Sequence, residues 1–136
     1  MRVIAVLFLA LAACAPTKML TTEPVLHQSS LVSERHGPTL VMASAVTMGN
    51  GPNMEYAIHF SVAAPSDKIE YAYAFDTPMP YIAETETSGY ITMSKEIFQK
   101  LSDSGIDVVL VGGTNAYDIT VPGTAFSEAL GRMAQN

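Results

Sequence analysis

Residues 40–62 read LVMASAVTMGNGPNMEYAIHFSV, two apolar runs separated by a cluster of glycine, asparagine and proline. In the second run every other residue is large and apolar, namely Tyr56, Ile58, Phe60 and Val62. This period of two predicts a strand with one face in the core and the other in water. Residues 49–53 favour a turn, because glycine and asparagine tolerate positive φ and proline fixes its own φ. We therefore expect a hairpin formed by residues 40–48 and 54–62.

Similar short runs continue toward the C-terminus. Strands are expected at residues 69–76, 81–86, 90–93, 106–111 and 116–121. Ser94 is a suitable N-cap and Gly105 a suitable stop, so residues 95–104 predict a short helix, and a second helix is expected from Thr124. This order predicts a mainly β fold with two short helices (α+β), arranged as a small antiparallel β-sandwich or half-barrel. The single globular domain is expected to span residues 40–136.

An aromatic row lies within residues 69–76. Its members share one face of the predicted strand: Ile69, Tyr71, Tyr73 and Phe75. Such a row is more often core than surface, so we expect it in the core. The alternative is a recognition surface, because tyrosine combines an apolar ring with a polar tip. Tyr81, beside Pro78 and Pro80, and Tyr90 are the candidate partner-binding residues.

The N-terminus has the three parts of a secretory signal. Arg2 is followed by an apolar run over residues 3–11 and then by small residues. The run is much shorter than the ~20 apolar residues that a membrane-spanning helix needs. We therefore expect residues 1–13 to be a signal peptide.

The last residues of this signal and the only cysteine of the chain form the motif Leu11-Ala12-Ala13-Cys14. It resembles the lipobox of bacterial lipoproteins. The resemblance implies cleavage before Cys14 and acylation of its sulfur and new amino group, for example with palmitate, which would anchor the mature protein to a membrane. The alternative is an ordinary secretory signal cleaved after Ala13, which leaves Cys14 as a free thiol.

Two features of the following sequence bear on location. Ala15 stands where an aspartate would resemble an inner-membrane retention signal of enteric-type bacteria, so the outer membrane facing the periplasm is favoured. Residues 14–39 are rich in Pro, Thr and Ser without sustained periodicity, which predicts a lipidated cysteine followed by a flexible tether. The alternative is that residues 24–32 form a first strand of the domain.

The chain is acidic, with a net charge of −6. Removing residues 1–13 removes Arg2, which leaves six basic against thirteen acidic residues, or 6 − 13 = −7. This charge disfavours nucleic acid as a partner. With no cysteine beyond Cys14, the mature chain cannot form an internal disulfide or a cysteine-based metal cluster.

Residues 93–133 carry a second resemblance. A helix, a glycine, two strands ending in Val121-Pro122 and a helix containing Phe126 follow one another, as in invasion-associated locus B-type periplasmic proteins. The resemblance implies a β-sandwich of the cell envelope. It brings no catalytic residues to this chain.

Catalytic motifs are not found in the sequence. His27, His36 and His59 fall in different predicted segments without metal-ligand spacing, and no G-x-S-x-G elbow is present. The carboxylates of Asp76, Glu84 and Glu86 could gather around a divalent cation, although an acidic solvated surface is the ordinary interpretation. We expect no cofactor and no metal.

Two function classes remain. The favoured one is a non-enzymatic, membrane-anchored lipoprotein of the bacterial cell envelope, a binding or assembly module for a protein or cell-wall partner. The alternative is a lipid-anchored enzyme, such as a cell-wall or periplasmic hydrolase.

Overall fold

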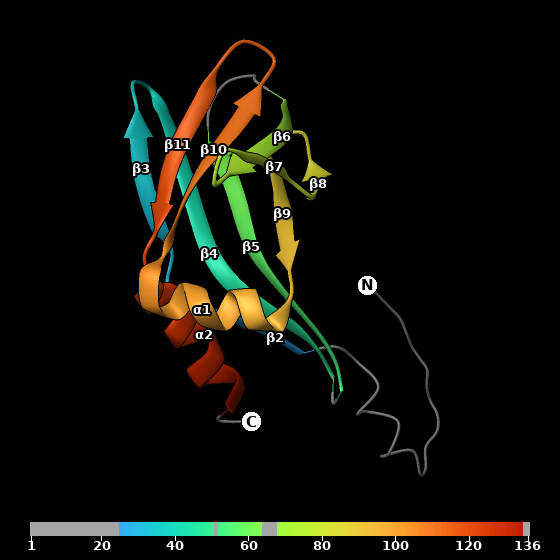
Figure 1. Ribbon diagram of the computed structural model, residues 1–136. Helices are drawn as coiled ribbons and strands as arrows, with labels where there is room; N and C mark the ends of the chain where they lie inside the picture. The colour runs from blue at the N-terminus through green and yellow to red at the C-terminus, as the bar shows by residue number, and fades with distance from the viewer. Residues whose placement is uncertain (1–24, 51, 64–67, 135–136) are drawn as a thin grey trace, which may run out of the picture.

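The computed structural model describes residues 25–50, 52–63 and 68–134. The predicted signal and lipidation residues, Leu11 to Cys14, lie outside these ranges. The fold is mainly β with two helices, and two antiparallel sheets pack together without closing into a barrel (Figure 1). The sandwich predicted from the sequence is therefore confirmed. None of the described helices is long and apolar enough to cross a membrane.

The larger sheet contains six strands in the order β2-β4-β5-β9-β8, with β3 also paired to β4. Their bounds are β2 Val25–Gln28, β3 Val32–His36, β4 Thr39–Asn50, β5 Asn53–Ala63, β8 Tyr81–Thr85 and β9 Ser88–Met93. The long hairpin of β4 and β5 forms its centre. It is the hairpin predicted from residues 40–62, and each strand end extends one or two residues beyond the predicted bound.

The second layer combines a smaller sheet with the helices. Its strands are β6 Ile69–Ala74, β7 Thr77–Met79, β10 Ile106–Gly112 and β11 Ala116–Val121, in the order β11-β10-β6-β7. Helices α1 (Lys95–Ser104) and α2 (Gly123–Ala134) lie below this sheet in Figure 1 and contact β5 and β4. The long sheet is thus covered by strands over one part of its inner face and by helices over the rest.

Two strands lie within the segment that was expected to be a tether. Residues 25–28 and 32–36 pair with β4 as β2 and β3, so the alternative of an early strand describes this region better than the tether does. Ser29 joins the two strands, because its N–H donates to the Ala45 carbonyl oxygen and its Oγ accepts from the Ala45 N–H, both at 2.9 Å. β2 falls within the alternative strand at residues 24–32, whereas β3 extends beyond it; both strands are short and only partly buried, so their pattern is weak.

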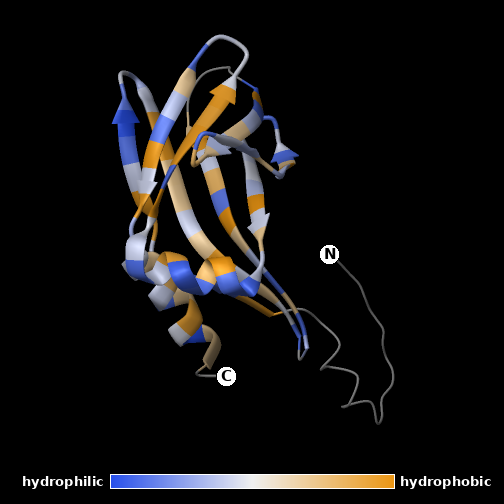
Figure 2. Cartoon of the chain, viewed as in Figure 1, coloured by the Kyte–Doolittle hydropathy of each residue, from blue (hydrophilic) through white to orange (hydrophobic). Residues whose placement is uncertain are grey.

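Alternation along the central strands builds the core. Tyr56, Ile58, Phe60 and Val62 are all buried, as their spacing predicted, and Figure 2 shows polar and apolar residues alternating along the strands. Between the sheet and the helices, the centroid of the Phe98 ring lies 5.3 Å from that of Tyr56 and 5.0 Å from that of Phe126. Phe98 and Phe126 are completely buried. This aromatic cluster joins both helices to the long sheet.

The first helix begins and ends where its sequence predicted. Ser94 Oγ accepts a hydrogen bond from the Ile97 N–H (3.3 Å), and the Gly105 N–H donates to the Leu101 carbonyl oxygen (2.7 Å). Gly105 has φ +69°, a conformation that favours glycine.

Side chains protect two sheet edges. At the edge of β11, Glu34 Oε2 accepts from the Thr120 N–H (2.7 Å) and His36 Nε2 donates to the Asp118 carbonyl oxygen (2.6 Å). These contacts from β3 satisfy backbone groups that would otherwise be open to another strand.

The edge of β2 is held by the last helix. Arg132 Nη1 donates to the Gln28 carbonyl oxygen (2.7 Å), and the Glu128 carboxylate accepts from the N–H of Ser30 (2.8 Å). Arg132 and Glu128 also form an ion pair at 2.7 Å. The first described strand is therefore fixed by the end of the chain.

Candidate functional site

A β-bulge turns the aromatic row of β6 outward. In the pairing of β6 with β10, Gly112 lies opposite Ile69 but Val111 lies opposite Tyr71, so the register shifts at Glu70. The side chains after the bulge consequently change faces. Ala72 and Ala74 are buried, whereas Tyr71 is 41% exposed and Phe75 is 67% exposed. The prediction that this row lies in the core is therefore wrong beyond Ile69.

The outer side of the smaller sheet thus carries an aromatic face. Strand register places these side chains on it: Tyr71, Tyr73, Pro78, Val109 and Val111. Phe75, in the turn that follows β6, adds an exposed ring beside them. The rings of Tyr71 and Tyr73 contact edge to face, with centroids 5.4 Å apart. A contiguous exposed apolar surface of this kind typically marks an interaction site.

Phe75 occupies an unfavourable backbone conformation. Phe75 (φ +55°) and Asp76 (φ +56°) form the two-residue turn between β6 and β7, and they are the non-glycine residues with positive φ in the described chain. Positive φ at both central positions is characteristic of a type I′ turn, which favours asparagine and glycine. An exposed phenylalanine there costs stability without adding to the core. Such strain often accompanies a functional position.

A hollow of about 710 Å³ lies beside this turn. Its lining includes Tyr73, Phe75 and Asp76, from β6 and the turn after it, together with Gly105, which follows α1, and Asp107 of β10. Thr120 Oγ1 donates to Asp107 Oδ1 (2.7 Å), which orients that carboxylate. We refer to this space as the turn hollow.

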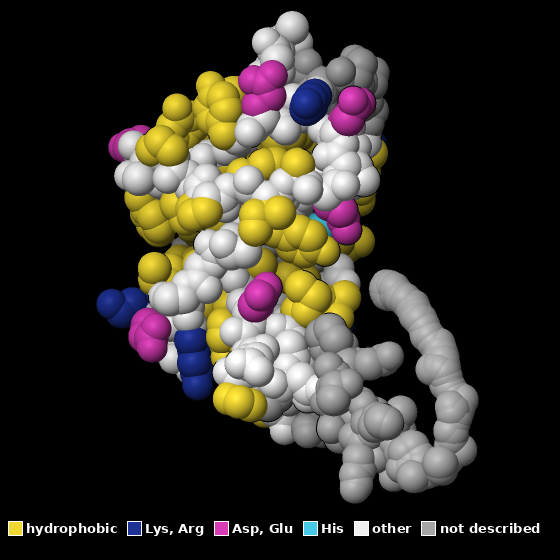
Figure 3. Space-filling model, turned by 90° about the vertical axis from the view of Figure 1, so that its right-hand side faces the viewer, with side chains coloured by type: hydrophobic (Ala, Val, Ile, Leu, Met, Phe, Trp, Pro, Cys, Tyr) yellow, Lys and Arg dark blue, Asp and Glu magenta, His cyan; other side chains and the backbone are white. Residues whose placement is uncertain are grey.

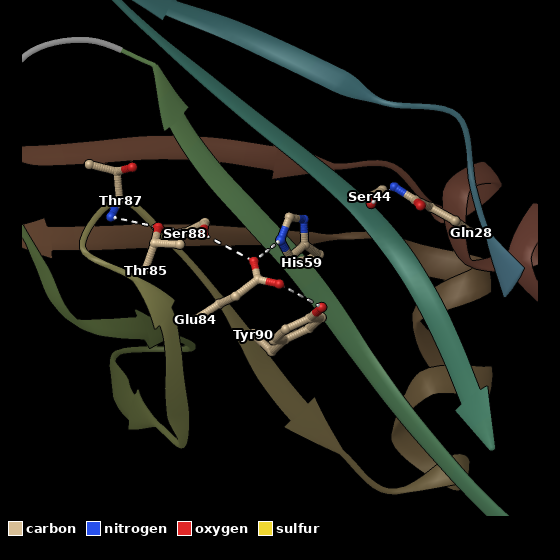
Figure 4. Close-up of polar contacts among 8 residues, drawn as sticks. All are labelled: Gln28, Ser44, His59, Glu84, Thr85, Thr87, Ser88 and Tyr90. Carbon is tan, nitrogen blue, oxygen red and sulfur yellow. Dashed lines mark hydrogen bonds and ion pairs between the residues drawn. The ribbon is translucent and has the colours of Figure 1, made fainter. Parts of the chain in front are cut away.

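A polar cluster lies on the outer face of the larger sheet, centred on Glu84 (Figure 4). Glu84 Oε1 accepts from His59 Nε2 and from Ser88 Oγ, both at 3.0 Å, and Glu84 Oε2 accepts from the Tyr90 hydroxyl at 3.4 Å. The ring centroids of His59 and Tyr90 are 4.8 Å apart. Figure 3 shows the side of the molecule that carries β8 and β9, where a histidine and an acidic side chain adjoin extensive hydrophobic surface.

The geometry of this cluster differs from that of a Ser-His-acid triad. In a Ser-His-acid triad the histidine contacts the serine and removes its proton. Here the carboxylate lies between them, and Ser88 is buried. Glu84 acts instead as a shared acceptor that holds β5, β8 and β9 together.

The hydrogen bond from His59 is the largest cause of a lowered pKa of Glu84, and those from Ser88 and Tyr90 act in the same direction. A lowered carboxyl pKa stabilises the fold above the unfolded-state pKa, and that stability disappears as pH falls through the folded-state value. We expect Glu84→Gln to lower the free energy of unfolding near neutral pH. The difference from wild type should shrink on acidification, as measured by urea titration at several pH values. Glu86→Gln, which removes a carboxylate outside the cluster, is the control, and an equal loss of stability near neutral pH in the two variants would contradict the assignment.

The two candidate tyrosines have different environments. Tyr90 is partly exposed within the Glu84 cluster, beside a hollow of about 220 Å³ that Met48 and Ile82 also line. Tyr81 instead packs against the core, and its buried hydroxyl has no hydrogen-bond partner among the described residues. Burial, followed by the charge of Glu84, raises the pKa of Tyr81. Tyr90 is thus accessible to a partner, while the Tyr81 hydroxyl is not.

Asp76, Glu84 and Glu86 do not assemble into a cation site. Within the described ranges, no three His, Cys, Asp or Glu side chains lie close enough together to hold a metal ion.

Searches with the whole sequence and structure found no matching protein-family model, no matching curated protein and no matching solved structure.

Proposed function

We propose that the protein is a lipid-anchored lipoprotein of the bacterial cell envelope whose domain is a non-catalytic binding module. The exposed aromatic face is the observation that carries the binding role. Tyr71 and Phe75 remain accessible although the same strand buries Ile69, Ala72 and Ala74. Large aromatic side chains at a surface are typical anchors of protein interfaces.

The anchor rests on the lipobox-like motif. Ten residues, 15–24, separate Cys14 from the start of β2. Such a segment reaches at most roughly 40 Å when extended, so the domain would stay close to the membrane. In Figure 1, β2 lies near the helices while β6 and β7 lie toward the other end, so the anchor would leave the aromatic face accessible. The outer membrane, facing the periplasm, is the location that Ala15 favours.

Replacing the cysteine tests the anchor. We expect wild-type protein extracted from membranes to have the mass of residues 14–136 plus acyl groups. Cys14→Ser should lose the acyl groups and leave the membrane fraction, because the thiol is the site of lipid attachment. Phe75→Asn is the matched control, since it should remain acylated and membrane-bound. A wild-type mass without acyl groups would rule out the lipoprotein.

A photo-reactive amino acid tests the binding role. Placed at Phe75 in membrane-bound protein, it should yield a defined crosslinked product. The same group at Ile97, which is 45% exposed on α1, should not yield that product. If crosslinkers at Phe75, Tyr71 and Tyr73 all fail to react with another component, the proposed binding face is wrong.

A further inference from the structure

We propose that the turn hollow binds an extended segment of a partner protein that carries arginine or lysine among apolar residues. This inference rests on the proposed binding role and adds the chemistry of the partner. Three properties of the hollow support it: a free strand edge, a negative wall and exposed aromatic rings.

The free edge belongs to β10. This strand pairs with β11 from Ile106 onward, but with β6 only from Val109 to Gly112. The earlier part of β10, residues 106–108, therefore has no strand partner on the β6 side among the described residues. Ile106 and Asp107 line the hollow at this point. An extended peptide can pair with such an edge through its backbone, which is the basis of β-strand addition.

The charges of the hollow favour a cation. Asp76 and Asp107 both line it, and neither lysine nor arginine is among its lining residues. Ser104 and Gly105 bring the C-terminal end of α1 to the same space, and the last turn of α1 contains no basic residue. Because the C-terminal end of a helix carries partial negative charge, it adds to the attraction of the two carboxylates.

Aromatic rings supply the apolar part of the site. Phe75 and Tyr73 flank the hollow on the β6 side. A guanidinium group can stack on such a ring while its N–H groups reach a carboxylate. The turn that presents Phe75 is already formed in the free protein, so little ordering is required when a partner binds.

These properties also discriminate among occupants. Anionic lipid headgroups and nucleic acid would be repelled by Asp76 and Asp107, and the chain has a net charge of −6. A second copy of this chain would bring the same acidic hollow to the interface. A neutral sugar would use the rings but neither the strand edge nor the charges. A basic and apolar peptide segment uses all three.

The test is an NMR titration of the mature chain, residues 14–136, with Cys14→Ser to keep it in solution. The probe is the peptide acetyl-Leu-Arg-Leu-Arg-Leu-amide, and acetyl-Leu-Gln-Leu-Gln-Leu-amide is its uncharged control. The arginine peptide should shift the amide signals of residues 73–76 and 104–108. The glutamine peptide lacks the positive charges that Asp76 and Asp107 attract. It should therefore bind at least about tenfold more weakly, a difference of about 1.4 kcal/mol.

Variants at the turn keep the result independent of folding. Phe75→Asn and Asp76→Asn both suit positive φ, so each should fold at least as well as wild type. Each should lower the affinity for the arginine peptide by roughly three- to tenfold, because Phe75→Asn removes a cation–π partner and Asp76→Asn removes a negative charge. Glu70→Gln removes an exposed carboxylate of β6 outside the hollow and should leave the affinity unchanged.

Several outcomes would overturn the inference. These are equal affinity of the two peptides, shifts confined to another surface, or concentration-dependent shifts at residues 73–76 without peptide, which would indicate self-association. If the Phe75 crosslinker reacts in the envelope while the arginine peptide fails to bind, the binding role stands and the partner chemistry is wrong. If no aromatic-face crosslinker reacts, the binding role itself fails.

Discussion

Phe98→Ala is expected to lower the free energy of unfolding by about 3–5 kcal/mol, a large share of the roughly 5–15 kcal/mol of a typical domain. The side chain is completely buried between Tyr56 and Phe126. Its removal therefore leaves a cavity where the helices meet the long sheet. Urea denaturation followed by circular dichroism measures the loss as a lower midpoint.

The same helix provides the control for Phe98. Ile97 precedes it but is 45% exposed, so Ile97→Ala should change the free energy of unfolding by no more than about 0.5 kcal/mol. If the two variants lose similar amounts, the aromatic cluster does not hold the helices on the sheet in the way that the structure indicates.

Replacing the turn Phe75-Asp76 by Asn-Gly is expected to raise the free energy of unfolding by about 1–2 kcal/mol. Both native residues have positive φ, which phenylalanine tolerates poorly, and Phe75 is too exposed to compensate through burial. Thermal unfolding should show a melting temperature higher by roughly 5 °C for a domain of this size. If the aromatic face binds a partner as proposed, the gain in stability should accompany a loss of crosslinking from Tyr71, because the substitution removes the exposed Phe75 ring.

A substitution by glycine in a different turn provides the control for this prediction. Thr87, between β8 and β9, does not have positive φ. Thr87→Gly should therefore lose about 0.5–1 kcal/mol through the greater freedom of the unfolded chain. If the Asn-Gly variant at residues 75–76 also has a lower free energy of unfolding than wild type, the native turn is not strained.

The sequence predicted the central elements because local pattern and tertiary burial agree there. Tyr56 to Val62 alternate without interruption, and Ser94 and Gly105 bound a helix by local hydrogen bonds. The row after Ile69 has an equally regular pattern, yet the bulge at Glu70 reverses its faces. Nothing in the alternation signals a bulge, because the shift depends on the register with β10, a strand more than thirty residues away.

The contacts around Glu84 could not be predicted from the sequence for the same reason. Tyr90 was identified from the sequence, but its partners Glu84 and His59 come from other strands and meet only through sheet register. Glu34 and His36 were assigned to a tether because their role, bonding the edge of β11, depends on contacts across more than eighty residues. A positive φ at Phe75 could not be inferred either, since phenylalanine is not a typical turn residue.

The attachment of β2 to α2 has a consequence for the order of folding. A chain is synthesised from its N-terminus, so Gln28 and Ser30 leave the ribosome about a hundred residues before Arg132 and Glu128, which bond them. β2 therefore lacks these bonds until α2 has been synthesised. A chain released early, for example at Pro122, would keep the β4–β5 hairpin sequence but leave the edge of β2 open to pairing with other chains. The edge of β2 is thus covered only after α2 has formed.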